Sequence, residues 1–385
     1  MRYLLIEDDA DKSDAIERFI RTKDSNAEIT ISNILSDARR LILTREFDLL
    51  IFDVFLPDQK GQEPRDISVD IISEYTSSRN ALRECITITR YVDEGMQQLP
   101  LFNDNGITIV VYAENSSRWQ DSLALKIQKI SNERRLDFVI FCALNKERMA
   151  YKDTSAKIGE LKQIGGLDCE EMEIDGFRGV CVKPTRMGLV NMAIAATKAI
   201  EMFRPAVVAM SGICAGVDGE SNYLDIVVGD VCWEYQTGKY KDGKFKQEPY
   251  QTSIKRPFRI DLEQMAQKKG FIDSLKVGLF DAELKDSKVV FGPISSGSAV
   301  VADAKKMTEI GMQHRKWSAL EMEMYSMYEA ASNSLLDPWC FGAKAVVDMG
   351  TASKGDHFHA SACVISARFV VEALRVSLPG ILKQR

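Results

Sequence analysis

Carboxylates follow two apolar, strand-like segments near the start of the chain. Residues 3–6 (Y-L-L-I) lead into Glu7 and Asp8, and residues 49–52 (L-L-I-F) lead into Asp53. The carboxyl ends of parallel strands meet at one edge of an open α/β sheet, so we expect these side chains to converge. Carboxylate oxygens are the ligands that Mg²⁺ prefers in proteins. The segments therefore predict a Mg²⁺ site formed by Glu7, Asp8 and Asp53, with Asp53 able to accept a phosphoryl group.

The turn after Asp53 has the spacing D-x-x-L-P-D-x-x-G, which ends at Gly61. Together with the acidic cluster, it resembles the receiver domain of bacterial response regulators. The resemblance covers residues 1–131 and implies a flavodoxin-like fold with a parallel five-stranded sheet. It also implies that Asp53 is the phosphoacceptor, that Thr89 after the fourth strand is the switch residue, and that a sensor histidine kinase or phosphotransfer protein is the partner.

The predicted fifth strand departs from that family. Receivers carry a lysine after this strand, whereas residues 107–112 lead into Ala113. A lysine there would pair with the aspartate or with phosphoryl oxygens and couple the modification to the rest of the domain. Two interpretations remain. Either Asp53 is phosphorylated and read out through Thr89 and Mg²⁺, or the domain is a pseudo-receiver that only docks.

Length and patterning predict a second, larger domain. A chain of 385 residues is too long for one ordinary core. Apolar residues recur at helical spacing over residues 119–130, a polar link follows at residues 131–135, and a new apolar strand begins at residue 138. We therefore expect one large α/β domain over residues 137–385.

Small residues follow a buried strand in this second domain. Residues 205–210 (P-A-V-V-A-M) lead into residues 211–216 (S-G-I-C-A-G). A loop of this composition lets a ligand approach the backbone, and successive N–H groups can hold an anion or a water molecule. Ser211, Gly212 and Cys214 are therefore candidate substrate-binding residues. The alternative is a tight turn without a ligand.

Further segments follow in a definite order. They are residues 227–231 (V-V-G-D-V), 292–300 (G-P-I-S-S-G-S-A-V) and 319–324 (A-L-E-M-E-M), and a strand that ends in Asp348. This order is similar to the purine nucleoside phosphorylase and nucleosidase superfamily. The resemblance spans nearly all of the second domain. It implies a nucleoside phosphorylase-like α/β fold that cleaves a purine N-glycosidic bond without a cofactor.

The resemblance also implies roles for the E-M-E triplet and Asp348. The second glutamate, Glu323, would bind the ribose 2′- and 3′-hydroxyls, Met322 would lie under the sugar, and Glu321 would complete the substrate-binding triplet. Asp348 would hydrogen-bond or protonate N7 of the purine. Such roles suit the reaction, because a carboxylate stabilises positive charge on the ribose and an acid makes the departing base neutral. The alternative is a solvated helix face with Asp348 as a helix cap.

The loop after residue 141 bears on the nucleophile. It reads C-A-L-N-K-E-R-M, close to the nucleosidase G-A-M-E-E-E pattern, which implies that Glu147 is the water-activating base. Phosphorylases place an arginine in this loop to hold phosphate. A carboxylate would repel phosphate but can deprotonate water, so hydrolysis is favoured. Arg148 and Arg186 keep phosphorolysis open.

A nucleotide substrate would need cations facing its 5′-phosphates, whereas a thioether-substituted nucleoside would need an apolar pocket. Six basic residues near the motifs are candidates for such cations. They are Lys146, Arg148, Lys183, Arg186, Lys255 and Arg256. Surface solvation is the alternative for each of them.

Composition excludes several other classes of protein. A net charge of −6 argues against a DNA-binding output. We see no signal peptide or membrane-length apolar run, so a cytoplasmic protein that does not bind membranes is expected. The eight cysteines form no C-x-x-C pair and predict reduced thiols, and the three histidines are too few and scattered for a metal cluster.

Both domains together resemble the effector of Detocs-type bacterial anti-phage two-component systems. This resemblance implies that phosphotransfer switches on the destruction of adenine nucleotides, chiefly by cleaving ATP to adenine and ribose 5′-triphosphate. One alternative is a methylthioadenosine/adenosylhomocysteine-type nucleosidase or a phosphorylase with a non-switching pseudo-receiver. Another is an inactive, nucleoside-sensing binding module. Members of the superfamily are usually oligomers, so we expect a homo-oligomer.

Overall fold

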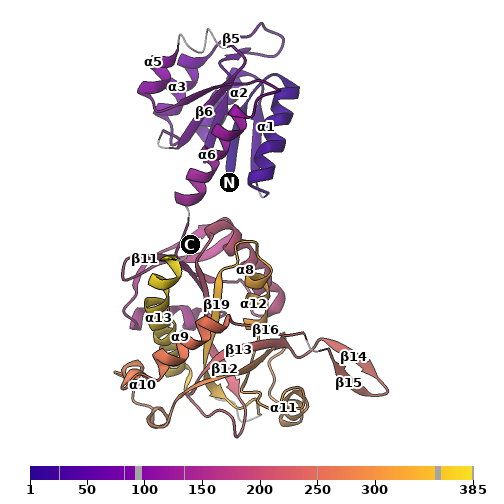
Figure 1. The fold of residues 1–385 in the computed structure, drawn as a ribbon, viewed down its shortest axis with the longest axis vertical. Coiled ribbons are helices and arrows are strands. Elements are labelled where there is room, and N and C mark those ends of the chain that lie inside the picture. Colours follow the sequence, from indigo (N-terminus) through magenta and orange to yellow (C-terminus); the bar gives the residue numbers. More distant parts are fainter. Residues whose placement is uncertain are drawn as a thin grey trace. The chain divides into compact units, whose positions relative to one another are not determined.

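The computed structural model describes residues 1–25, 27–81, 83–91, 98–133, 135–248, 250–351 and 357–383. The chain divides into two compact units, Met1–Arg134 and Arg135–Arg385. Each unit is built on its own sheet (Figure 1).

The first unit is a doubly wound parallel sheet. Its strands lie in the order β2 (Glu28–Ser32), β1 (Arg2–Ile6), β3 (Leu49–Phe52), β6 (Glu84–Thr89) and β7 (Thr108–Val111), and all four pairings are parallel. Numbered along the chain, this is the 2-1-3-4-5 order of flavodoxin-like sheets. The predicted parallel five-stranded sheet is confirmed.

Helices cover both faces of this sheet. One face is covered by α2 (Leu35–Thr44), α3 (Ser68–Ser77) and α5 (Leu99–Asp104), and the other by α1 (Ala10–Lys23) and α6 (Arg118–Glu133). Two short strands after β3, β4 (Phe55–Leu56) and β5 (Arg65–Asp66), pair with each other.

Strand β1 is buried because its alternate side chains enter different cores. Leu4 and Ile6 join the core beneath α2 and α3, whereas Tyr3 and Leu5 join the core beneath α1 and α6. A strand covered on both sides reads as a continuous apolar run. The polar residues that follow β1 therefore lie at the edge of the sheet, beside the end of β3.

The second unit is built on a mixed sheet of ten strands. Nine of them lie in the order β16 (Thr252–Ser253), β13 (Ile226–Glu234), β17 (Val289–Ser296), β18 (Ala319–Glu321), β12 (Val207–Gly216), β8 (Phe138–Phe141), β11 (Phe177–Lys183), β10 (Leu167–Ile174) and β9 (Lys157–Ile164). The tenth strand, β19 (Trp339–Asp348), pairs parallel with β12 and antiparallel with β13. A separate hairpin, β14 (Gly238–Lys241) and β15 (Lys244–Gln247), projects from this unit (Figure 1).

Helices pack around the larger sheet. The 25-residue helix α13 (His359–Lys383) packs against β12 and β19, and α8 (Leu189–Phe203) packs against α12 (Met324–Ser332). The remaining helices are α7 (Asn145–Met149), α9 (Arg256–Ala266), α10 (Phe271–Leu275) and α11 (Ala304–Gly311), with 3₁₀ turns η1 (Ala150–Asp153) and η2 (Ala282–Lys285). Within the described ranges, no helix is long and apolar enough to cross a bilayer.

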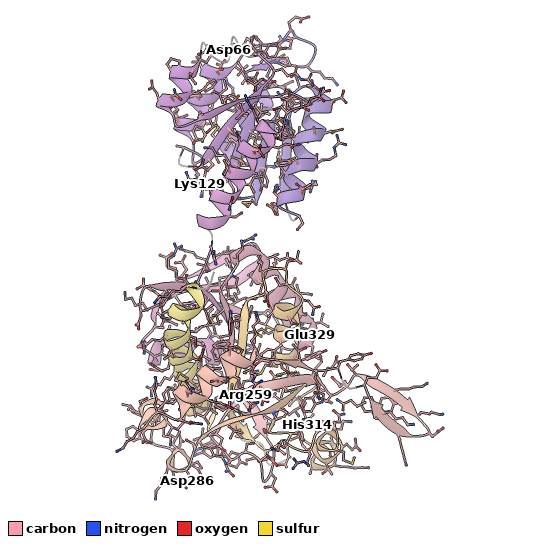
Figure 2. The ribbon with its side chains drawn as sticks, viewed as in Figure 1. Asp66, Lys129, Arg259, Asp286, His314 and Glu329 are labelled. Atoms are coloured by element: carbon pink, nitrogen blue, oxygen red, sulfur yellow. The ribbon has the colours of Figure 1, made fainter. Side chains whose placement is uncertain are left out.

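Side-chain contacts also join these elements. The Thr252 hydroxyl donates to Glu329, which Figure 2 labels, and this bond links β16 to α12. His314, also labelled, lies beside Trp233 with 5.5 Å between ring centroids. His314 therefore packs against an aromatic ring.

Residues 211–216 differ from the sequence prediction. They were expected to form a loop, but they continue strand β12 to Gly216. The segment stays extended because β19 pairs along it and β18 pairs with its last two residues. The prediction of a loop was wrong because small residues here permit close packing rather than a turn.

Candidate active site

Glu147 lies in the first turn of α7, shortly after the end of β8. The backbone N–H of Leu144 donates to Oε2 at 2.9 Å, and the N–H of Ile213 on β12 donates to Oε1 at 3.0 Å. The residue is only 2% exposed. Its own loop therefore holds one carboxylate oxygen, and the central strand holds the other.

Gly212 permits this close approach of Glu147 to β12. Its φ is +142°, and a Cβ at this position would overlap the Glu147 carboxylate. Its N–H also donates to the Ser366 hydroxyl on α13 at 2.8 Å. Glycine meets these steric and conformational demands without strain. The predicted contact of Gly212 with substrate stays a prediction.

A buried lysine faces the E-M-E triplet. Lys344 on β19 is 1% exposed, and its Nζ lies 2.8 Å from Glu321 Oε2 and 3.1 Å from Glu323 Oε2. No motif in the sequence pointed to this residue. A lone lysine inside the apolar run of β19 was the available signal, because lysine is almost never fully buried without a partner.

Glu321 holds the beginning of α12. Its Oε2 accepts the N–H of Glu323 at 2.9 Å, and its Oε1 accepts the N–H of Met324 at 2.9 Å. The Ser296 hydroxyl also donates to it. Negative charge at a helix N-terminus is stabilised by these N–H groups. The contacts favour a role in positioning Glu323, and substrate binding by Glu321 stays a prediction.

Glu323 connects the triplet to a distant loop. Its Oε1 accepts the N–H of Gly188 at 3.0 Å, while Oε2 faces Lys344. Gly188 follows the loop that carries the exposed Arg186. Met322 is half-buried between the two glutamates. The fold therefore brings Glu323, Lys344 and the Arg186 loop into one region.

Burial and charge shift the pKa values of this cluster. Burial alone would lower the pKa of Lys344, but Glu321, Glu323 and Glu147 together raise it well above its ordinary value. Burial raises the pKa of Glu147, while Lys344 and the backbone N–H groups oppose the rise and Glu323 adds to it. Lys344 therefore stays charged, and Glu147 binds a proton more readily than an exposed glutamate does.

Asp348 is the half-buried last residue of β19. Its Oδ1 accepts the N–H of Gly350 at 2.6 Å. A β-bulge lies just before Asp348. Cys214 of β12 pairs with Val346 and the next residue, Ala215, pairs with Asp348, so one residue of β19 is left without a partner in the register. Bulges of this kind re-aim side chains next to active sites. Asp348 thus follows Lys344 on one strand and stands at its carboxyl end.

Ser211 and Cys214 are buried on β12. Tyr151 donates its hydroxyl to Ser211 Oγ at 2.8 Å, and the Cys142 sulfur lies 3.2 Å from the same oxygen. Burial raises the pKa of the Cys214 thiol, which therefore stays protonated. Their predicted contact with substrate stays a prediction.

The signature of the phosphorylase superfamily matches residues 137–367. The chain belongs to the phosphorylase superfamily. The matched range contains the whole cluster described above, including Glu147, Glu323, Lys344 and Asp348.

Solved structures share the fold of this phosphorylase-superfamily domain. One is the 5′-methylthioadenosine/S-adenosylhomocysteine nucleosidase of Neisseria meningitidis in complex with methylthio-immucillin-A, with 21% identity, 62% of this chain and 99% of that chain covered, and a TM-score of 0.50. Another is the futalosine hydrolase of Helicobacter pylori, with 15% identity, 64% and 99% covered, and a TM-score of 0.52. At these identities the likeness concerns the fold alone.

A full-length relative occurs in Sinorhizobium fredii. The uncharacterized protein y4jS is 23% identical over 416 residues, which cover 97% of this chain and 98% of that protein. The likeness therefore extends beyond the phosphorylase-superfamily domain into the N-terminal unit.

Several of the predicted phosphate-binding cations pair with acidic or aromatic neighbours. Asp168 accepts Arg148 Nη1 at 2.7 Å and lies 3.3 Å from Lys183 Nζ. Lys255 lies 2.7 Å from Asp337 and packs over a tryptophan ring. Lys146 contacts His359, and the remaining two candidates, Arg186 and Arg256, are exposed. The structure therefore commits Arg148, Lys183 and Lys255 to ion pairs.

The acidic edge of the N-terminal sheet contains another buried lysine. Lys12 of α1 places Nζ 2.5 Å from Asp53 Oδ2 and 2.7 Å from Glu7 Oε2. Asp53 Oδ1 accepts the N–H of Val54 at 2.6 Å. Burial raises the pKa of Glu7 to about 7; Lys12 opposes this rise and Asp53 adds to it. The structure thus brings two of the three predicted Mg²⁺ ligands together around an ammonium group.

The other predicted residues of this edge differ in exposure. Asp8 is exposed, whereas Thr89 is fully buried and its Oγ1 accepts the N–H of Tyr91 at 3.1 Å. Arg90 contacts Asp9 and lies 3.3 Å from Glu114, which follows Ala113. Two cations therefore reach this edge, Lys12 from α1 and Arg90 from the end of β6. Neither comes from the segment after β7, where receivers carry their lysine.

Proposed function

We propose that the phosphorylase-superfamily domain is a purine nucleosidase that hydrolyses the N-glycosidic bond of adenine nucleotides. The observation that carries this proposal is the cluster in which Glu321 and Glu323 contact the buried Lys344, with Glu147 close enough to raise the pKa of that lysine and Asp348 at the end of the same strand. It offers an acidic group for water, one for the sugar and one for the base.

The reaction needs one water molecule and two acid–base groups. The water oxygen forms a bond to the anomeric carbon while the bond from that carbon to the purine nitrogen breaks. The departing base keeps the electron pair. Glu147 accepts a proton from the water, and Asp348 donates one to N7, so the base leaves neutral. Glu323 holds the ribose hydroxyls as positive charge develops on the ring.

Charge in the cluster favours water over phosphate. Glu147, Glu321 and Glu323 all act on a single ammonium group, that of Lys344. Arg148, the arginine beside Glu147, pairs with Asp168. A phosphate dianion would meet more carboxylates than free cations here, and like charges disfavour its binding. Water carries no such penalty.

ATP is the substrate that we propose within this class. Arg186 supports it, because its exposed side chain precedes Gly188, whose N–H contacts the Glu323 carboxylate. A cation at this place could face phosphates attached to the ribose. The ion pairs of Arg148 and Lys183 favour the second candidate, a neutral nucleoside such as methylthioadenosine, which is bound by a protein of the same fold in another solved structure.

We also propose that the N-terminal unit is a response-regulator receiver that switches the nucleosidase on. Its flavodoxin-like strand order and the buried Asp53 at the end of β3 support this role. The partner would be a sensor histidine kinase or a phosphotransfer protein. The chain resembles Detocs-type effectors. We therefore propose that it acts as a cytoplasmic homo-oligomer that depletes ATP during phage infection.

The experiment incubates the full-length protein with ATP, adenosine or methylthioadenosine, with and without inorganic phosphate and acetyl phosphate. Chromatography identifies the products. We expect adenine and ribose 5′-triphosphate from ATP without any need for inorganic phosphate. Strict dependence on phosphate, with a ribose 1-phosphate product, would overturn hydrolysis. No adenine from any of the three substrates, from folded protein treated with the phosphodonor, would overturn the nucleosidase.

A further inference from the structure

Lys12 lies completely inside the N-terminal unit. It is 0% exposed, and its ammonium contacts both Glu7 and Asp53. Its Nζ also lies 5.7 Å from the ring centroid of Tyr112. An ammonium group loses its hydration when it is buried, and only close partners offset that cost. The two carboxylates and the aromatic ring supply such partners.

Local structure directs Lys12 to this place. Asp9 is the N-cap of α1, and its side chain accepts the backbone N–H of Lys12 at 3.1 Å. This cap fixes the first turn of α1 directly beyond β1. The Lys12 side chain then reaches across the carboxyl ends of β1 and β3.

This arrangement does not fit the divalent cation predicted from the sequence. Mg²⁺ binds carboxylate oxygens at about 2.0–2.1 Å and keeps several waters. The Lys12 ammonium already contacts one oxygen of Glu7 and one of Asp53. A divalent ion between the same oxygens would be repelled by this positive charge. Within the described ranges, no group of three or more His, Cys, Asp or Glu side chains is arranged to hold a metal ion.

We propose that Lys12 is a resident cation that takes the place of the divalent metal at the acidic edge. The edge therefore does not bind Mg²⁺ or Mn²⁺. Lys12 also supplies the positive charge that is missing at Ala113, but from the opposite end of the domain sequence. This inference depends on neither nucleosidase activity nor phosphorylation, so its test is separate from that of the proposed function.

The test titrates Mn²⁺ into four full-length proteins and measures binding by calorimetry. They are the wild type, Asp53→Asn, Lys12→Met and the double variant Lys12→Met/Asp53→Asn. Methionine keeps much of the length and apolar volume of lysine without its charge. Circular dichroism checks that each protein is folded.

We expect the wild type and Asp53→Asn to bind Mn²⁺ alike, with no site that depends on Asp53. Lys12→Met should gain one site per chain, at least tenfold tighter than any wild-type binding, and the double variant should lose it. An Asp53-dependent site in the wild type would overturn the proposal. A folded Lys12→Met protein without a new site would do the same. If Lys12→Met does not fold, the comparison of wild type with Asp53→Asn still decides whether the native edge holds a metal.

Discussion

At the scale of single residues, the carboxyl groups of the cluster differ in what surrounds them. Glu147 is buried and held by two backbone N–H groups, whereas Asp348 is half-buried at the end of its strand. Such different surroundings suit groups with different proton-transfer roles.

Replacing Asp348 with Asn should reduce adenine release roughly 100-fold or more, because the amide cannot donate a proton to the purine. Folding should be retained, since the amide oxygen can still accept the N–H of Gly350. Rates of adenine release and thermal unfolding of both proteins check this. Wild-type activity in folded Asp348→Asn would remove Asp348 from the proposed mechanism.

Ionisation of Glu147 should raise the activity and lower the stability of the protein as pH rises. Its pKa is raised above 4.5 by burial, so the ionised base forms only at higher pH, and kcat/KM should rise through that pKa. The contribution of Glu147 to stability is fully present below 4.5 and is lost as pH rises through the raised pKa. Relative to the wild type, Glu147→Gln should therefore become more stable as pH rises.

Urea unfolding of wild type and Glu147→Gln, from below pH 4.5 to above the raised pKa of Glu147, measures the stability difference. Initial rates over the same range measure activity, which Glu147→Gln should lack. A stability difference that does not change with pH would contradict the raised pKa.

At the scale of elements, two central strands position the cluster. Strand β12 carries Gly212 and Ile213 against Glu147, and β19 carries Lys344 and Asp348. Each strand therefore serves both the core and the site. Changes on these strands should show whether packing or chemistry is lost.

Gly212→Ala should destabilise the protein by about 1–3 kcal/mol and strongly reduce activity, because the new Cβ meets the Glu147 carboxylate. Gly219→Ala is a matched control, since Gly219 also has positive φ, +79°, but has no atom within 4 Å of the added Cβ. Chemical unfolding and adenine release are compared. Equal effects of both substitutions would mean that backbone strain alone, and not the contact with Glu147, explains the loss.

Lys344→Met should destabilise the protein by about 3–5 kcal/mol, because it leaves the buried carboxylates of Glu321 and Glu323 without their cation. The exposed Lys239→Met on hairpin β14–β15 serves as the control and should unfold like the wild type. Urea unfolding near neutral pH measures both. If Lys344→Met were as stable as the wild type, the ion cluster would make no net contribution to the free energy of unfolding.

At the scale of the whole molecule, we propose that one chain contains a switch unit and an enzyme unit. Each unit has its own cores and its own sheet. Control of one unit by the other requires that phosphorylation change the relative stability of two states. A 100-fold activation needs only about 2.7 kcal/mol of such differential stabilisation.

Acetyl phosphate should activate the wild type but not Asp53→Ala, because only the aspartate can form the acyl phosphate. In this step a carboxylate oxygen bonds to phosphorus and acetate leaves with the electron pair of the broken bond. Adenine release is measured for both proteins with and without the donor. Equal activity of both proteins with and without the donor would show that the N-terminal unit does not switch the enzyme.

The local sequence was enough to predict the elements that end in the candidate site residues. Apolar runs with polar ends revealed β1 and β3, and with them the convergence of Glu7 and Asp53. The order of later motifs indicated the superfamily, which the match over residues 137–367 shows. These features are patterns along the chain, so they can be recognised in one sequence without knowledge of its tertiary structure.

Only the tertiary structure decided which cations lie among the carboxylates and which small residues stay extended. Lys12 is ordinary in sequence and Lys344 stands out only as a lone lysine in an apolar run, yet each is buried against two acidic side chains from other elements. Residues 211–216 form a strand because β18 and β19 pair with them, although their composition suggested a turn. Burial of a charge and pairing of a strand both depend on partners that the tertiary fold brings together, such as Asp53 for Lys12 and Glu323 for Lys344, and no local pattern specifies such partners.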